Sequence, residues 1–341
     1  MTARPRVGPP RAGAGAAPGR GAVRDEVGTK AAPFCDDVRA SVTAGTRECP
    51  WGRLGRTPGR MPPPIRSPAM TGTPFTYLSH LVTLPVRVGD VEARFVLDTG
   101  IGPTILTGAV ARRVGCVPNG ETFTGQRMSG QEVGVPLAEA PSIALGSYVR
   151  DGHVVGVLDT TGFPDAFAAI DGFLSLAFFE ERAFTVDYEH RLVVVETPET
   201  LAERVVQGVA VPVRLERRGP ALDAFLHLTV PGLGPIEVEV DIGSDSLILD
   251  TRHAPAVGVR LDDPTVRRVE GQDETGHAYL RCFTRLDRTI HVTAEPSVAL
   301  DEPDVMFQEI IYDGLIGHAF LGRFTVTYDM PGARMIFGPR V

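Results

Sequence analysis

The apolar residues of this chain come in short runs that are rich in Val, Ile, Leu and Phe and bounded by glycine, proline or polar residues. Such runs predict β-strands. The clearest pair is residues 81–88 and 91–97, which Gly89 and Asp90 separate as in a β-hairpin. Further strands are predicted at residues 105–106, 143–146, 184–195, 209–215 and 222–230.

Helical patterns are few and short. Residues 109–114 predict a helix that ends at Gly115, residues 163–179 are the best longer candidate, and residues 252–257 predict another short helix. Many short strands with few helices predict a mainly β fold.

Two apolar strands end in the same way, with an aspartate, one further residue and a glycine. The first runs from Phe95 through Asp98 and Thr99 to Gly100, and the second runs from Val238 through Asp241 and Ile242 to Gly243. Glycine adopts positive φ without steric cost and lets another backbone come close. The pattern therefore predicts two carboxylates at strand-to-loop corners, although one Asp-Thr-Gly alone is typical of an ordinary turn.

The two corners belong to a longer repeat with nearly constant offsets. Asp98 and Asp241 are separated by 241 − 98 = 143 residues. Three other blocks recur in the same order: Gly125-Gln126 with Ser129-Gly130 as Gly271-Gln272 with Thr275-Gly276, Asp171–Phe178 as Asp313–Phe320, and Phe184–Tyr188 as Phe324–Tyr328. Four ordered blocks indicate a duplicated chain, and a period of about 140 residues is too long for a solenoid. We expect an N-terminal lobe over residues 73–200 and a C-terminal lobe over residues 205–341, joined by a short linker near residues 196–207.

Residues 1–72 differ from the remainder of the chain. They are rich in Pro, Gly, Ala and Arg and show no period of 2 or 3.6 residues. A segment of this kind buries too little apolar surface to offset its chain entropy, so we expect a disordered tail.

Composition excludes several classes of protein. The net charge of −8 argues against nucleic-acid binding, which uses clustered Lys and Arg. No apolar run approaches the roughly 20 residues of a membrane helix. The N-terminus lacks the apolar segment of a signal peptide, so a cytoplasmic location is expected. The four cysteines are scattered and are interpreted as reduced thiols. The eight histidines show no ligand spacing, and neither a metal nor another cofactor is predicted.

The repeated features resemble the aspartic proteases of retropepsin-like and pepsin-like fold. The resemblance covers about residues 76–341 and rests on the two Asp-x-Gly corners, the glycine-bearing hairpins and the apolar-apolar-Gly sequence Leu315-Ile316-Gly317. It implies a two-lobed, acid-protease-like β-barrel fold with an internal pseudo-twofold duplication. Because each half carries a flap-like hairpin, the retropepsin pattern fits better than the single flap of pepsin. The implied flap residues, which would bind substrate, are Gly125, Ser129, Gly130, Gly271, Thr275 and Gly276.

The resemblance also implies a mechanism and a substrate. Asp98 and Asp241 would share one proton, as is established for aspartic-protease dyads, and activate a water that hydrolyses a peptide bond. Thr99, Gly100, Gly243 and Ser244 would support the catalytic loops. Ser244 is placed to donate a hydrogen bond to Asp241, which predicts the charge on Asp241 and the proton on Asp98. The expected partner is an extended polypeptide, bound by a monomer with pseudo-dimeric lobes.

Three positions depart from the family pattern. Ser175 stands where the first half should carry the glycine of apolar-apolar-Gly, Ile242 replaces a threonine, and Ile101 is the counterpart of Ser244. These departures leave open a catalytically degenerate peptide-binding module of the same fold. A purely structural two-lobed protein is a third alternative, but it leaves the paired acids unexplained.

Other acidic residues recur without an expected catalytic role. Asp171 and Asp313 each precede a glycine and predict helix caps or turns, whereas Asp187 and Asp329 follow the closing strands and are assigned to turns or solvent.

Overall fold

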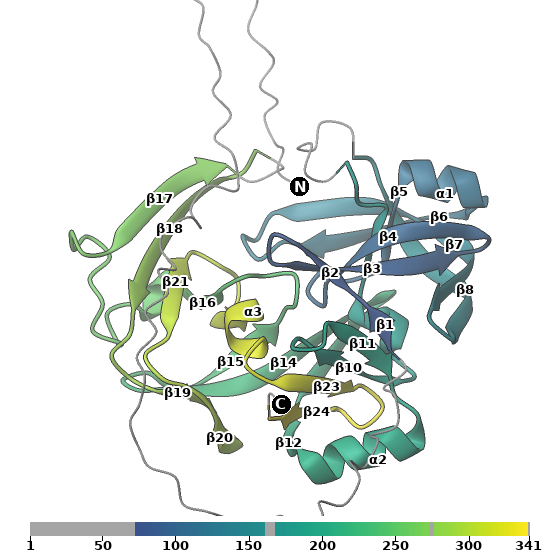
Figure 1. Cartoon of the computed structure of the whole chain (residues 1–341). Helices are drawn as coiled ribbons and strands as arrows, with labels where there is room; N and C mark the ends of the chain where they lie inside the picture. The colour runs from purple at the N-terminus through teal and green to yellow at the C-terminus, as the bar shows by residue number, and fades with distance from the viewer. Residues whose placement is uncertain (1–71, 161–167, 273–275, 340–341) are drawn as a thin grey trace, which may run out of the picture. The chain divides into compact units, whose positions relative to one another are not determined.

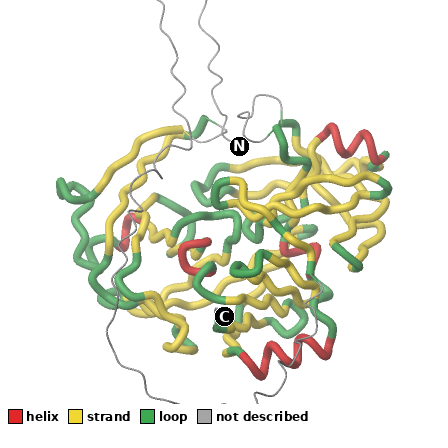
Figure 2. Tube along the Cα trace, in the orientation of Figure 1, coloured by secondary structure: helices red, strands yellow, loops and turns green. Residues whose placement is uncertain are grey.

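The computed structural model describes residues 72–160, 168–272 and 276–339, all within one compact unit, Arg60–Val341. Apart from Gly72, the expected disordered tail lies outside the described residues. Strands dominate the described chain and form three sheets (Figures 1 and 2), so the predicted mainly β fold is confirmed.

The first sheet, here the N-terminal sheet, carries the first Asp-x-Gly corner. Its strands follow in the order β2 (Thr76–Leu78), β3 (Leu81–Val88), β4 (Val91–Leu97), β9 (Gly172–Leu174), β5 (Ile105–Thr107), β8 (Tyr148–Leu158), β7 (Glu132–Leu145) and β6 (Val117–Gln126). The predicted helix after β5 is confirmed as α1 (Gly108–Val114). The hydroxyl of Thr107 caps its first turn, and Gly115 ends it with a left-handed φ of 72°.

The C-terminal sheet carries the second corner. Its order is β17 (Arg267–Gln272), β18 (Ala278–Arg285), β21 (Asp304–Gln308), β16 (Leu247–Asp250), β22 (Gly314–Ile316), β15 (Gly234–Val240), β14 (Ala221–Val230), β19 (Ile290–Val292) and β20 (Glu295–Leu300), with β13 (Arg214–Arg218) also paired to β14.

The strands around the two corners pair in the same way. β4 runs parallel to β9 as β15 runs parallel to β22, and β5 pairs with β8 as β16 pairs with β21. The N–H of Asp98 donates to the carbonyl of Leu174 at 3.0 Å, and the N–H of Asp241 donates to the carbonyl of Ile316 at 3.0 Å. Each corner is therefore fixed by the apolar strand that follows later in its own half.

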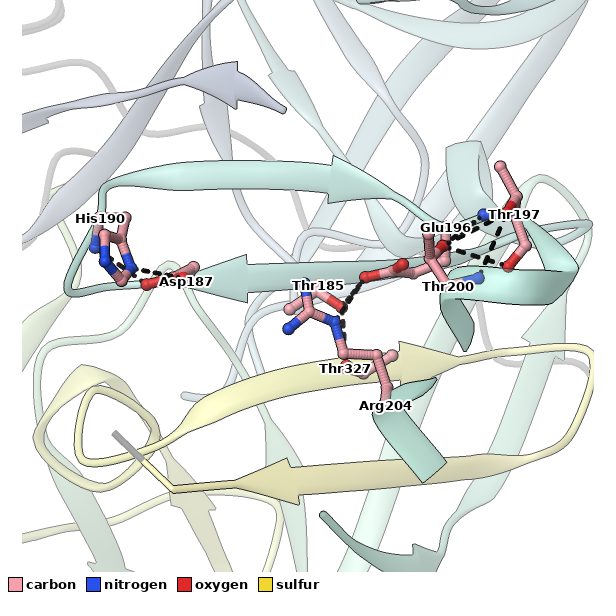
Figure 3. A network of polar contacts seen from close by, with 8 residues as sticks. All are labelled: Thr185, Asp187, His190, Glu196, Thr197, Thr200, Arg204 and Thr327. Carbon is pink, nitrogen blue, oxygen red and sulfur yellow. Dashed lines mark hydrogen bonds and ion pairs between the residues drawn. The ribbon is translucent and has the colours of Figure 1, made fainter. Parts of the chain in front are cut away.

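A central sheet joins strands from both halves. Its order is β1 (Thr73–Pro74), β11 (Leu192–Val195), β10 (Ala183–Asp187), β23 (Thr325–Asp329), β24 (Arg334–Gly338) and β12 (Val209–Pro212). At its middle Thr185 pairs with Thr327, and their hydroxyls hydrogen-bond at 2.7 Å (Figure 3). Phe184 stacks on Tyr328 beside them, with ring centroids 4.7 Å apart. Equivalent residues of the repeated block thus meet across this sheet.

The expected linker at residues 196–207 is instead largely helical. Residues Pro198–Gln207 form α2, which begins with a capping box between Thr197 and Thr200 and has proline in its first turn. Arg204 of α2 donates to the buried carboxylate of Glu196 at 3.0 Å, and Glu196 in turn accepts from the Thr185 hydroxyl (Figure 3). The helix is therefore tied to the central sheet.

Two other helix predictions are wrong. Of residues 163–179, those at 161–167 lie outside the described residues, and the rest form β9 and the 3-10 helix η2 (Leu176–Phe179). Gly172 lies so close to β5 that a Cβ there would be 2.4 Å from the carbonyl oxygen of Ile105. Of residues 252–257, the first two end the 3-10 helix η3 (Thr251–His253) and the other four form turns. The apolar residues at 176–179 are buried, but their apolar character did not distinguish an α-helix from a short strand and a 3-10 helix.

The four recurring acids, Asp171, Asp313, Asp187 and Asp329, accept hydrogen bonds that hold neighbouring segments or turns in place. Asp171 accepts from the backbone N–H of Arg94 at 2.8 Å, and Asp313 accepts from Arg252 and His253, so neither caps a helix as expected. Asp187 and Asp329 do anchor turns, accepting from the N–H groups of His190 and Gly332. Both are nevertheless buried, at 4% and 3% exposed, so the assignment to solvent is wrong.

Candidate active site

The two Asp-x-Gly corners meet. A Cβ atom placed on Gly100 would lie 2.8 Å from Cγ of Asp241, and one placed on Gly243 would lie 2.6 Å from Cγ of Asp98. Real Cβ atoms do not come this close, so each glycine is required by the aspartate of the opposite half. The two carboxyl groups hydrogen-bond to each other. The structure therefore brings together the two acids that the repeat singled out.

Each loop also holds its own carboxylate. The N–H of Gly100 donates to Oδ1 of Asp98 at 3.1 Å, and the N–H of Gly243 donates to Oδ1 of Asp241 at 2.7 Å. Both aspartates keep some solvent-accessible surface, so they are only partly buried. The side chains are thus fixed in place while a face of the pair remains reachable.

Thr99 crosses to the opposite loop. Its hydroxyl donates to the carbonyl of Val240 at 2.8 Å and accepts from the N–H of Ile242 at 3.0 Å. Thr99 is 1% exposed and Ile242 is fully buried. The isoleucine at position 242 therefore leaves Thr99 without a hydroxyl partner but not without hydrogen bonds, because the backbone groups on either side of Asp241 supply them.

The environments of the two acids differ. Burial raises the pKa of Asp98 well above its ordinary value, and the charge of Asp241 and the hydrogen bond that protonated Asp98 donates to it raise this pKa further. Burial also raises the pKa of Asp241, but the N–H groups of Gly243 and Gly100, the Asp98 carboxyl and His80 all act in the opposite direction. The proton therefore belongs on Asp98 and the charge on Asp241.

The predicted cause of this asymmetry is wrong. Within the described part of the chain, no hydrogen bond joins the Ser244 hydroxyl to the Asp241 carboxylate. Ser244 instead uses its backbone, donating its N–H to the carbonyl of Asp241 at 3.3 Å and accepting from the N–H of His318 at 2.8 Å. Serine at this position supports the loop rather than the charge.

His80 is a site residue that sequence reasoning missed. It lies in the turn between β2 and β3, and its Nε2 is 3.2 Å from the carbonyl oxygen of Gly243. Because a carbonyl oxygen can only accept, Nε2 carries the proton in this contact. His80 thereby links the N-terminal sheet to the second catalytic loop and lowers the pKa of Asp241. The partners are 163 residues apart in the chain, so no local pattern marks the pair.

The missing glycine of the first half has a structural explanation. Ser175 is fully buried, and its hydroxyl hydrogen-bonds to that of Thr104 at 3.1 Å. In the second half a Cβ on Gly317 would lie only 2.4 Å from the carbonyl oxygen of Ser244. The loop after Asp241 packs directly against Gly317 and leaves no space for a side chain, whereas the equivalent position in the first half accommodates the side chain of Ser175.

The first predicted flap is a β6–β7 hairpin whose tip reaches the other half. Its turn is closed by the N–H of Arg127, which donates to the carbonyl of Gln131 at 2.9 Å, and Gly130 has a positive φ of 81°. The N–H of Ile311 donates to the carbonyl of Met128 at 2.8 Å. The hydroxyl of Ser129 is buried at this tip with no hydrogen-bond partner in the described structure.

The glycines of the two hairpins do not share one role. A Cβ on Gly125 would lie 2.9 Å from the Phe123 ring, so this glycine makes room within its own strand. Gly271 similarly lies against Tyr279 in the β17–β18 hairpin, and Gly276 has a positive φ of 80°. Thr275 lies outside the described residues, so its part in binding stays a prediction.

Three further observations concern metal sites, membrane helices and cysteines. Among the described residues, no group of three or more His, Cys, Asp and Glu is placed to hold a metal ion. The described helices include none with the length and apolar character needed to cross a membrane. Cys116 and Cys282 are free thiols, and Cys35 and Cys49 lie outside the described residues.

Comparison with known proteins agrees with this geometry. Residues 84–178, which include the first corner and the first hairpin, match the family model described as aspartyl protease. A search of curated proteins finds no match. Among solved structures, the chain is similar to the crystal structure of Basic 7S globulin from soybean, at 10% identity and a TM-score of 0.49, with 78% of this chain and 93% of that chain covered. That weak likeness carries no weight here; the family match supports the predicted aspartic-protease-like family.

Proposed function

We propose that the protein is an aspartic endopeptidase that hydrolyses peptide bonds with the Asp98–Asp241 pair. The observation that carries this proposal is the meeting of two partly buried Asp-x-Gly corners whose carboxyls differ in their tendency to hold a proton. Water attacks a peptide carbonyl efficiently only when one group removes a proton from the water and another gives one to the carbonyl oxygen. A charged Asp241 and a protonated Asp98 supply both.

In the proposed reaction, Asp241 takes a proton from a water held between the carboxyls as its oxygen attacks the carbonyl carbon. Asp98 gives its proton to the carbonyl oxygen, forming a tetrahedral diol. As that diol collapses and the C–N bond breaks, Asp241 gives its newly gained proton to the leaving nitrogen and Asp98 takes one back from a diol hydroxyl, which restores the starting state of the pair. The N–H groups of Gly100 and Gly243 keep the carboxyls oriented throughout. One carboxylate cannot perform both transfers, so both acids are required.

The proposed substrate is an extended polypeptide that lies beneath the β6–β7 hairpin. Extended peptides bind by adding main-chain hydrogen bonds to strand-like protein segments. At the hairpin tip, the buried and unpartnered side-chain hydroxyl of Ser129 is available to hydrogen-bond the main chain of the substrate. Since the tip also contacts Ile311, substrate entry requires the Met128–Ile311 hydrogen bond to open.

We also propose that the two halves, residues 73–200 and 205–341, arose by duplication and together act as a covalent version of a retropepsin-like dimer. The equivalent strand pairings at the two corners and the Thr185–Thr327 contact support this proposal. The second hairpin, β17–β18, is the counterpart of the first.

The test is hydrolysis of an unfolded protein, with the new termini identified by mass spectrometry. We expect cleavage that pepstatin inhibits, because its secondary hydroxyl takes the place of the attacking water. Binding of peptides without any cleavage would instead favour the peptide-binding module. A protein that neither binds nor cleaves peptides would contradict both functions.

A further inference from the structure

A third acid, Glu239, lies on the strand that delivers Asp241. Glu239 is two residues before Asp241 in β15, and alternate residues of a strand face the same side of a sheet. It is only 4% exposed. The same position before Asp98 is Val96, which is fully buried and apolar. The acid is therefore a feature of the second half alone.

The Glu239 carboxyl has no partner. Among the residues that the structure describes, none forms a hydrogen bond or an ion pair with it. Arg218, a nearby cation, is already engaged, because its Nη2 lies 2.7 Å from Oδ2 of Asp223. A buried carboxyl without such a partner is costly, so it is retained only where something offsets the cost.

The surroundings of Glu239 are strongly acidic. Asp241, Asp223 and Asp98 all act on it electrostatically, and Arg218 acts in the opposite sense. Tyr312 also lies within electrostatic reach, and its ring packs edge-on against Phe225, the residue that pairs with Glu239 across β14 and β15. Burial, followed by the neighbouring acids Asp241, Asp223 and Asp98, raises the pKa of Glu239 well above its ordinary value, so this carboxyl holds its proton to higher pH than a free glutamate does.

An apolar substrate side chain would leave this carboxyl buried and unsatisfied. A lysine or arginine side chain would instead bring positive charge and hydrogen-bond donors to a carboxyl on which Asp241, Asp223 and Asp98 all act electrostatically. We propose that Glu239 lines a subsite beside the dyad that selects a basic residue, Lys or Arg, next to the scissile bond of the polypeptide. This inference rests on the proposed peptidase function.

The proposal has a thermodynamic consequence. A bound cation favours the ionised form of Glu239, so wherever this carboxyl is still protonated, binding of a basic peptide releases its proton to solvent. An otherwise identical neutral peptide releases none through this group. Calorimetry in two buffers with different ionisation enthalpies measures that difference directly.

The test uses peptides built on a cleavage site found in an unfolded protein, with Lys or the neutral, similarly shaped norleucine directly before or directly after the scissile bond. We expect wild type to prefer one Lys peptide by about tenfold or more in kcat/KM, and Glu239→Gln and Glu239→Val to lose that preference while still cleaving the norleucine peptide. Glu237→Gln is the matched control, since Glu237 lies on the same strand but pairs with Arg214 near the surface.

Equal cleavage of Lys and norleucine peptides by wild type, or an unchanged Lys preference in Glu239→Gln, would overturn the subsite proposal while leaving the peptidase intact. If wild type cleaves nothing, the peptidase proposal fails, and extended peptides of one fixed sequence, with Lys or norleucine at a central position, are then compared by fluorescence anisotropy. Tighter binding of the Lys peptide that depends on Glu239 would still support the acidic subsite, and equal binding would refute it.

Discussion

The hydroxyl of Thr99 is held between the two backbone groups that flank Asp241 on the opposite loop, the carbonyl of Val240 at 2.8 Å and the N–H of Ile242 at 3.0 Å. One side chain therefore joins both catalytic loops. Because isoleucine cannot return the interaction, the link is asymmetric and depends on Thr99 alone.

Replacing Thr99 by valine tests this link. The change preserves the shape of the side chain but leaves a buried carbonyl and a buried N–H without partners. Each such group costs on the order of 1–3 kcal/mol. We expect a lower free energy of unfolding by urea denaturation and weaker hydrolysis. Thr99→Ser keeps the hydroxyl and serves as the control; equal stability of the valine and serine variants would show that the link contributes nothing.

The raised pKa of Asp98 predicts a stability that falls with increasing pH. In the unfolded chain this carboxyl titrates near the ordinary value of 3.8, whereas in the folded protein it holds its proton to higher pH. The stability associated with the protonated form is fully present below the unfolded pKa and is lost as pH rises through the folded pKa. Asp98→Asn removes this loss.

We therefore expect Asp98→Asn to be more stable than wild type near neutral pH and to gain less, or nothing, near pH 4. Urea unfolding at both pH values measures the difference. The exposed Asp245→Asn, from the same loop as Asp241, is the matched control. A wild type that is as stable as Asp98→Asn at neutral pH would contradict the assigned proton.

His80 predicts a shift in the pH dependence of hydrolysis. The imidazole lowers the pKa of Asp241, so His80→Gln should move the acidic limb of the pH–rate profile to higher pH. Ser244→Ala should leave that limb in place, because the serine hydroxyl does not bond to Asp241 in the described structure. A shift in the serine variant alone would reverse the explanation given for the asymmetry.

The equivalent positions Ser175 and Gly317 should respond differently to replacement by alanine. A methyl group on Gly317 would lie 2.4 Å from the Ser244 carbonyl oxygen, so Gly317→Ala must displace the second catalytic loop. We expect a loss of thermal stability and of hydrolysis. Ser175→Ala removes only the hydrogen bond to Thr104 and should cost about 1 kcal/mol. If thermal unfolding shows the two variants to be equally stable, the loop is not packed against Gly317 as described.

Hydrophobic alternation, glycine positions and the internal repeat predicted several strands, one helix and the paired aspartates. Alternation and glycine punctuation located β3, β4 and α1, and the repeat raised Asp98 and Asp241 above ordinary turns. The buried run ending at Phe179 was mistaken for a helix because burial on all sides hides the period of a strand or a 3-10 helix. Helix α2 was missed although Thr197, Pro198 and Thr200 carry the signal of a capped helix start.

The environment of the site could not be predicted in the same way. His80 reaches Gly243 across 163 residues, and Glu239 follows the alternation of an ordinary strand in which nothing marks one acid as buried. Both depend on tertiary packing. The assignment of the charge to Asp241 agreed in direction with the structure, but through backbone N–H groups and His80 rather than through Ser244.

The central claim is that neither aspartate alone supports hydrolysis. It is tested most directly by initial rates of cleavage of an unfolded protein by wild type, Asp98→Asn, Asp241→Asn and the control Asp245→Asn, each first shown to be folded by its circular dichroism spectrum. Loss of cleavage in both dyad variants, with Asp245→Asn as active as wild type, is the predicted result. Cleavage at the wild-type rate by either dyad variant would contradict the account.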